Sequence, residues 1–153
     1  MTLKKKNYGF NIVEVMLAIS LTSILAIGTL SYQYFDVKHG RQTDAQLMAT
    51  RIGQLLLEDW KSTGGDADYD PESLNLGFSP PDVHEYGSYR ITLGTTTFYI
   101  SLNNEDIQTD ATAGVTLRSI AVTVKWRSDL GKGVIRNYDP ALTFTTYVRR
   151  DED

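Results

Sequence analysis

Hydrophobic residues follow three different patterns along the chain. From Phe10 to Leu30 nearly every residue is apolar, so a helix built from this segment is apolar on all sides. From Tyr32 to about Ser62 apolar residues recur at steps of three and four, which predicts an amphipathic helix. From Ser88 onward they alternate with polar residues, which predicts strands. These periods indicate an α+β chain in which a long N-terminal helix precedes an antiparallel sheet.

The first segment has the length of a membrane span. As a helix, Phe10 to Leu30 is roughly 31 Å long at 1.5 Å per residue, about one hydrocarbon thickness. Its few hydroxyl side chains can bond back to helix carbonyl groups. Three lysines precede it, which favours a cytoplasmic N-terminus, although Lys38 and Arg41 on the far side weaken that bias. We expect a single-pass membrane anchor, with the rest of the chain outside the cytoplasm.

The second segment carries one apolar stripe, suited to covering a sheet of its own chain. Gly64 and Gly65 are expected to end the helix. Gly28, Gly40 and Gly53 are expected weak points within it. We interpret the stripe as packing and not as a cofactor site. It consists of Ala45, Met48, Ala49, Ile52, Leu55, Leu56 and Trp60.

The remaining residues, 63–153, are predicted to form a globular head. Asp70-Pro71 is typical of the cap and first position of a short helical turn. The sequence Gly94-Thr95-Thr96 predicts a hairpin turn, Asn103 to Gly114 an acidic loop, Asp129 to Gly133 another turn, and the last five residues a frayed tail. One apolar face per strand predicts a sheet covered on one side, and the helix stripe is the available cover. The expected inward residues are Tyr89, Ile91, Leu93, Phe98, Ile100, Leu102, Ile120, Val122, Val124, Trp126, Leu142, Phe144, Thr146 and Val148.

Composition narrows the class of protein. The chain has no cysteine, so an exported head must be stabilised by its core and not by disulfides. The formal charge is −4, and without the three N-terminal lysines 12 basic and 19 acidic side chains remain, or about −7. An acidic head counts against a nucleic-acid surface.

The start of the apolar segment contains a specific motif. Lys4, Lys5 and Lys6 are followed by Gly9-Phe10-Asn11-Ile12-Val13-Glu14, and a charge such as Glu14 is expensive in a segment otherwise suited to lipid. This arrangement resembles the processing site of type IV prepilins and type II secretion pseudopilins. The resemblance implies that a prepilin peptidase cuts after Gly9 and methylates the amine of Phe10. It also implies that residues 1–9 are a leader and that Glu14 serves assembly by meeting the amine of a neighbouring subunit.

An ordinary signal peptide is the simpler alternative. Val15 to Leu25 then forms its apolar region and Ala26-Ile27-Gly28 its cleavage site. Glu14 counts against this interpretation because it splits the apolar run near its start. The absence of a helix breaker between the two helical segments also counts against it.

A second, looser resemblance comes from the C-terminal strands. Ile120 to Trp126, a glycine turn, and Leu142 to Val148 are similar to minor pilins of the pilus modification kind and to I-type minor pseudopilins. Asn11 stands where this family usually has Thr, and Ser31 where major pilins usually carry a kinking proline. The family resemblance implies a non-enzymatic minor subunit of a type IV pilus or type II secretion pseudopilus. Its partners would be the prepilin peptidase, other subunits and an inner-membrane assembly platform.

Catalytic and metal-binding motifs are weak in this sequence. The histidines are His39 and His84, and no nucleophile elbow or phosphate loop is present, so we expect no enzyme activity and no cofactor. The segment Asp66 to Asp70 begins like an EF-hand loop but has Pro71 in place of the sixth-position glycine. A looser calcium site in this acidic loop is an alternative to a solvated loop.

Two other functions stay open at this stage. A competence pilin for DNA uptake needs a basic stripe, and Arg90, Lys125 and Arg127 are able to share one sheet face. A signal-anchored periplasmic adaptor needs the anchor but never enters a filament.

Overall fold

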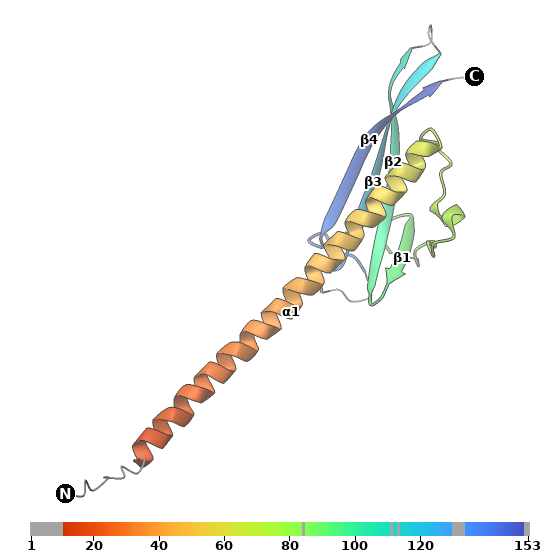
Figure 1. Ribbon diagram of the computed structural model, residues 1–153. Helices are drawn as coiled ribbons and strands as arrows, with labels where there is room; N and C mark the ends of the chain where they lie inside the picture. Colours follow the sequence, from red (N-terminus) through yellow and green to blue (C-terminus); the bar gives the residue numbers. More distant parts are fainter. Residues whose placement is uncertain (1–10, 84, 111, 113, 130–133, 152–153) are drawn as a thin grey trace, which may run out of the picture. The chain divides into compact units, whose positions relative to one another are not determined.

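A computed structural model describes residues 11–83, 85–110, 112, 114–129 and 134–151. The helix α1 (Ile12–Ser62) is followed by the 3-10 helix η1 (Pro71–Leu74) and by the strands β1 (Tyr89–Leu93), β2 (Thr96–Asp110), β3 (Val115–Trp126) and β4 (Ala141–Asp151) (Figure 1). The strands form one antiparallel sheet in the order β1-β2-β3-β4. The predicted α+β class is confirmed.

The chain forms two compact units that meet between Arg41 and Gln42. In the first unit, every described residue up to Gly40 is exposed. The second unit holds the rest of α1, η1 and the sheet. α1 is continuous through all three glycines that the sequence marks as weak points. It ends at Ser62, and Gly64 and Gly65 follow closely with positive φ, as expected of residues that stop a helix.

The C-terminal part of α1 covers the sheet with a narrower stripe than the sequence predicts. Met48 and Leu55 are 39% and 41% exposed, so the prediction that these two residues pack on the sheet is wrong. The reason is that they lie on one edge of the stripe. The residues that α1 buries are Ala45, Ala49, Ile52, Gly53, Leu56 and Trp60.

Gly53 is one of these buried positions. A Cβ atom added there would collide with the ring of Phe144 on β4. The glycine therefore leaves room for this ring against the helix, and is not only a weak point of the helix.

The sheet presents its predicted apolar face to this stripe. Ile100 pairs with Val124, and Val122 pairs with Phe144, so inward side chains of adjacent strands lie side by side. Phe98, Ile100, Ile120, Val122 and Val124 are fully buried, and Trp126 nearly so. A two-residue turn at Gly94-Thr95 joins β1 to β2, whereas the predicted turn residue Thr96 already belongs to β2.

The predicted acidic loop from Asn103 to Gly114 is largely strand. β2 continues to Asp110 and pairs with β3 down to Val115, with an irregularity at Ile107. This part of β2 is polar on both faces, so it carries no apolar alternation for the sequence to reveal. Its strand conformation comes instead from backbone pairing with β3.

Arg118 is the main polar group on the buried face of the sheet. Its guanidinium donates to Asp106 at 2.5 and 3.0 Å and to the carbonyl of Gly65 at 3.0 Å. The hydrogen bond from Arg118 lowers the pKa of Asp106. Arg118 thereby ties the extended part of β2 to the segment that follows α1.

The C-terminal tail also departs from its prediction. β4 extends through Arg149 and Arg150 to Asp151, and Arg149 donates to Asp151 at 2.9 Å. Residues 152 and 153 lie outside the described residues. Pairing with Val115 to Leu117 of β3 keeps these charged residues in the strand.

Asp139 holds the described ends of the β3–β4 connection together. It accepts the backbone N–H and the hydroxyl of Ser128, both at 3.0 Å, and the backbone N–H of Arg136 at 2.7 Å. Burial opposes its charge, but these hydrogen bonds prevail and the pKa of Asp139 is lowered. The predicted turn from Asp129 to Gly133 lies mostly outside the described residues.

The segment between α1 and β1 packs on the head by specific contacts. Asp70 caps η1 by accepting the Glu72 N–H at 3.0 Å, as predicted. Tyr69 stacks on Trp60 with ring centroids 5.3 Å apart and donates to Asp59 at 2.8 Å. Burial and the hydrogen bond to Asp59 raise the pKa of Tyr69, so it stays protonated.

Candidate functional site

Glu14 lies in the first turn of α1, two residues after the helix begins at Ile12. The carbonyl of Asn11 accepts the N–H groups of Glu14 at 2.9 Å and Val15 at 3.2 Å. A carboxylate at this position favours the positive end of the helix dipole. The sequence favours a helix start at this point, because Asn11 is a preferred N-cap residue.

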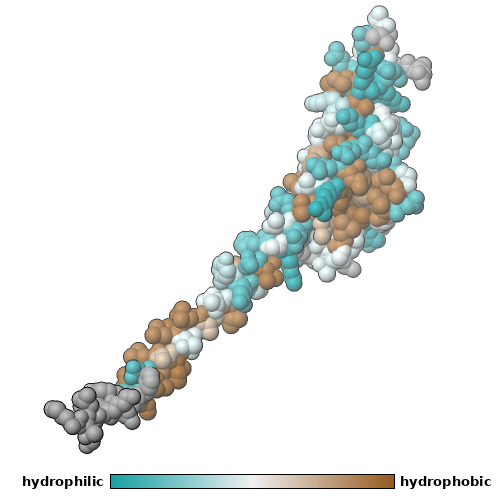
Figure 2. Space-filling model, in the orientation of Figure 1, coloured by the Kyte–Doolittle hydropathy of each residue, from teal (hydrophilic) through white to brown (hydrophobic). Residues whose placement is uncertain are grey.

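Exposed apolar side chains surround Glu14. The large apolar residues between Ile12 and Leu30 are 43% to 75% exposed. Figure 2 shows apolar side chains gathered over this part of α1. Among the described residues, α1 is long and apolar enough to cross a membrane, and its most apolar stretch is not buried at all. A core helix of a soluble domain meets the same length test but is mostly buried, so that explanation does not fit.

The hydroxyl groups of this segment are satisfied within the helix. Ser20, Thr22 and Ser23 donate to the carbonyl groups four residues earlier at 2.7 to 2.8 Å. Thr29 donates to Leu25 and Ala26, both at 2.9 Å. The prediction that these hydroxyls bond back is confirmed. Their polarity therefore adds little to the cost of placing the segment in lipid.

The other residues of the processing motif cannot be placed beside Glu14. Lys4, Lys5, Lys6, Gly9 and Phe10 lie outside the described residues. The cleavage site and the amine of Phe10 stay predictions. The structure thus describes the motif only from Asn11 to Glu14, and Glu14 is the charged residue of that part.

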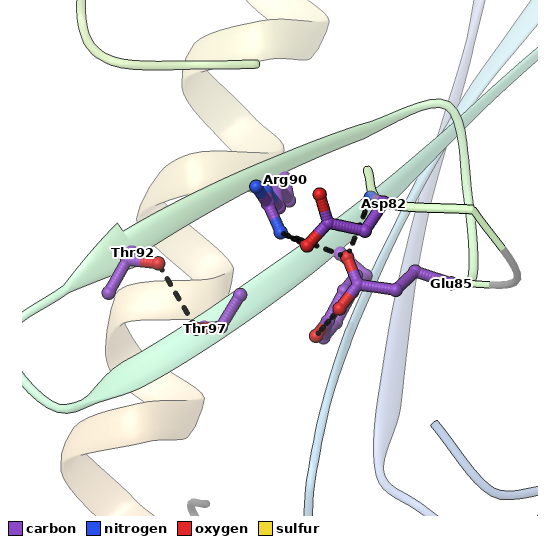
Figure 3. A network of polar contacts seen from close by, with 6 residues as sticks. Asp82, Glu85, Arg90, Thr92 and Thr97 are labelled. Carbon is purple, nitrogen blue, oxygen red and sulfur yellow. Dashed lines mark hydrogen bonds and ion pairs between the residues drawn. The ribbon is translucent and has the colours of Figure 1, made fainter. Parts of the chain in front are cut away.

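A polar network on the head was not foreseen from the sequence (Figure 3). The carboxylate of Glu85 accepts the hydroxyl of Tyr99 at 3.0 Å, the guanidinium of Arg90 at 3.2 Å and the backbone N–H of Asp82 at 3.0 Å. Arg90 also donates to Asp82 at 2.6 Å. The alternation of β2 places Tyr99 on the face opposite the core, but nothing local in the sequence pairs it with Glu85.

This network lines a cleft with a volume of about 490 Å³. Burial and the hydrogen bond to Glu85 raise the pKa of Tyr99 to about 12, so the phenol stays neutral at physiological pH. The phenol donates a hydrogen bond to a carboxylate already held by Arg90 and a backbone N–H. Such a set fixes a loop on a sheet and supplies neither a free base nor an activated nucleophile.

The three cations that the sequence offers for a DNA-binding face, Arg90, Lys125 and Arg127, already contact other side chains of the head. Tyr99 pairs with Arg90 on one side and Lys125 on the other, so these two cations share a sheet face as predicted. Arg90 binds Asp82 and Glu85, and Arg127 forms an ion pair with Asp129. Lys125 lies over the ring of Tyr86 at 4.4 Å. Neighbouring carboxylates offset the positive potential that phosphate recognition requires.

The acidic segment that starts like an EF-hand loop has other roles. The carbonyl of Asp66 accepts the indole N–H of Trp60 at 2.7 Å, and Asp70 caps η1. Within the described part of the chain, no three carboxylate or histidine side chains gather at one point. A solvated loop stays the prediction, and a loose calcium site stays the untested alternative. His39 is exposed on α1, and His84 lies outside the described residues.

No family model, curated protein or solved structure matches this chain.

Proposed function

We propose that this chain is a minor pilin or pseudopilin: a membrane-anchored, non-enzymatic subunit of a type IV pilus or type II secretion pseudopilus. One observation carries the proposal. A single helix, α1, is apolar and exposed on all sides in its first part and packed on a sheet in its last part. The first part calls for lipid or other helices as its surroundings, and the second part for the head of its own chain.

Processing by a prepilin peptidase is the next step of the proposal. Cleavage after Gly9 removes the lysines and gives Phe10 a free, methylated amine. The span is kept, because Phe10 to Leu30 stays on the mature chain. The subunit then waits in the inner membrane with its head outside the cytoplasm until the assembly platform moves it into a filament.

Glu14 gives this proposal its residue-level chemistry. Glu14 and the mature amine are four residues apart in the sequence, the spacing at which two groups of a helix share one face. In lipid each of these charges is costly when unpaired. Pairing between Glu14 of one subunit and the Phe10 amine of its neighbour neutralises both charges and sets the axial register of the two helices. Pairing of Glu14 with the amine of its own chain would not set the axial position of one helix relative to its neighbour.

The test replaces Glu14 and measures assembly. Glu14→Ala is expected to leave cleavage and head folding intact but to lower the fraction of mature protein that co-purifies with sheared filaments or supports secretion. Glu14→Asp is expected to restore assembly only partly, because its shorter side chain lengthens the contact. Glu58→Ala, which removes an exposed carboxylate in the packed part of α1, is the matched control and should assemble normally.

Normal assembly of Glu14→Ala would contradict the pairing of Glu14 with a neighbouring amine and would leave only its favourable interaction with the dipole of its own helix. DNA uptake is tested separately by measuring DNA binding of the full chain at two salt concentrations. We expect no salt-dependent binding, because the arginines of the proposed basic face are held by Asp82, Glu85 and Asp129.

A further inference from the structure

Between the all-round apolar part of α1 and its packed part lies a short segment of mixed character, residues 31–41, here named the boundary segment. It carries three aromatic side chains, Tyr32, Tyr34 and Phe35, which are 73%, 69% and 56% exposed. Val37 is 57% exposed. Lys38 and Arg41 follow within one and a half turns. Nothing in the proposed function assigns a role to this segment.

The apolar side chains of the boundary segment are spread around the helix. At about 100° per residue, Tyr32, Tyr34, Phe35 and Val37 cover roughly 220° of the circumference. A helix that packs against one partner presents a stripe of about 100° or slightly more. This distribution suits surroundings that are similar in all directions, as at a membrane surface.

The boundary segment also lies at the right distance from the start of α1. Ile12 and Tyr32 are twenty residues apart, which is about 30 Å along the helix axis. The hydrocarbon layer of a bilayer is about 30 Å thick. A span that starts at Ile12 therefore places the three rings where the headgroups begin, the depth at which Tyr is enriched in membrane proteins.

The charges in the last turn of the boundary segment indicate which surface it binds. Lys38 and Arg41 outnumber Asp36, so residues 31–41 are locally basic although the chain as a whole carries −4. We propose that the boundary segment lies in the headgroup layer on the head's side of the membrane. There the rings of Tyr32, Tyr34 and Phe35 occupy the interface, and Lys38 and Arg41 bind the phosphates of anionic phospholipids. This inference rests on the membrane anchoring in the proposed function.

The test uses the full chain in lipid nanodiscs that contain phosphatidylcholine and phosphatidylglycerol. Because the chain has no cysteine, single cysteines at Ile27, Gln33 and Gly40 can be labelled with a nitroxide one at a time. Collision with oxygen reports lipid, and collision with a water-soluble nickel complex reports water. We expect a label at 27 to be in lipid, a label at 40 to be in water, and the crossover to fall within one helical turn of 33.

A second measurement tests the two cations. Replacing phosphatidylglycerol by phosphatidylcholine is expected to raise the water access of the label at 33, at the crossover, several-fold, since the headgroup charge that holds Lys38 and Arg41 is lost. The variant Lys38→Gln/Arg41→Gln should show no such lipid dependence. The control Arg51→Gln/Lys61→Gln, which removes two exposed cations further along α1, should behave like the parent chain.

The outcomes separate this inference from the anchoring on which it rests. Water access at all three positions would contradict anchoring and the boundary together. Lipid access at 27, with the crossover before residue 29 or beyond residue 40, would overturn the boundary assignment alone. Equal lipid dependence in the parent and Lys38→Gln/Arg41→Gln would overturn headgroup binding by these cations.

Discussion

The two ends of α1 have the same backbone conformation but opposite surroundings. Near the N-terminal end, Leu17 and Leu21 are each 60% exposed, whereas Leu56 is fully buried and Trp60 is 2% exposed. Backbone hydrogen bonds alone do not account for this difference, because both ends form them. The difference comes from the side-chain pattern: all-round apolarity in one part and a stripe in the other.

This contrast shows what each part of the helix requires. The sheet of the same chain buries the stripe, so the packing of the stripe contributes to the stability of the head. Among the residues that the structure describes, none covers the all-round apolar part, which calls for lipid or other helices as its surroundings. Mutations in the two parts should therefore affect different measurements, and the following predictions test that separation.

The largest effect is expected in the packed part. Trp60→Ala removes a buried ring that stacks on Tyr69 and should lower the free energy of unfolding by about 3–5 kcal/mol. Leu55→Ala, at a position that is 41% exposed, should cost less than about 1 kcal/mol. Denaturant unfolding of a head that lacks residues 1–34, which we expect to fold alone, measures both. Equal midpoints for the two variants would contradict the packing of Trp60.

The next largest effect is expected in the exposed part and in a different measurement. Leu21→Lys places a charge near the middle of the span and should disfavour membrane insertion by about 3 kcal/mol, with no change in the melting temperature of the head. Leu47→Lys, on an exposed site of the packed part, is the control and should insert normally. Full insertion of Leu21→Lys would show that this part of α1 does not span a bilayer.

Two glycines of the same helix sharpen the comparison. Gly53→Ala forces a methyl group into the ring of Phe144 and should destabilise the head by about 1–3 kcal/mol. Combining it with Phe144→Leu should restore part of the loss. Gly28→Ala meets no atom within 4 Å and should leave head stability unchanged while slowing amide exchange around residue 28. Destabilisation of the head by Gly28→Ala would mean that the two parts are not independent.

The smallest predicted effect concerns pH. The pKa of Asp139 is lowered in the folded head, so its ionised form contributes stability above the unfolded pKa, near 4, and that contribution is lost as pH falls through the folded value. Asp139→Asn should therefore be destabilised at neutral pH and should lose less stability than the parent between pH 5 and pH 2. Glu58→Gln, at an exposed site, should follow the parent curve. If Asp139→Asn lost as much stability as the parent between pH 5 and pH 2, the proposed contribution of this carboxylate would be contradicted.

Much of the fold could be predicted because its signals are local. The period of three and four gives the packed part of α1, and the alternation in Ile120 to Trp126 gives the core of β3. Asp70-Pro71 gives the cap of η1. The membrane-span prediction rests on the same kind of signal, since every residue of the apolar run contributes to it.

The errors occur where order comes from distant partners. The outer half of β2 has no apolar face, and it is a strand because β3 pairs with it and Arg118 holds Asp106. Leu55 belongs to the stripe by its spacing, yet the sheet does not reach far enough to cover it. The contact between Glu85 and Tyr99 joins a loop to a strand fourteen residues away, and neither residue signals the other. For the candidate site, the sequence predicts Glu14 and its apolar surroundings, whereas the pairing partner that we propose for Glu14 belongs to another subunit.

The central claim is that the mature chain keeps its apolar helix and begins at Phe10. Intact-mass measurement of the protein purified from its native host tests this claim most directly. We predict a chain that starts at Phe10, carries one additional methyl group and retains Ile12 to Leu30. A mature chain that starts near Thr29, after Gly28, would establish an ordinary signal peptide and would contradict the claim.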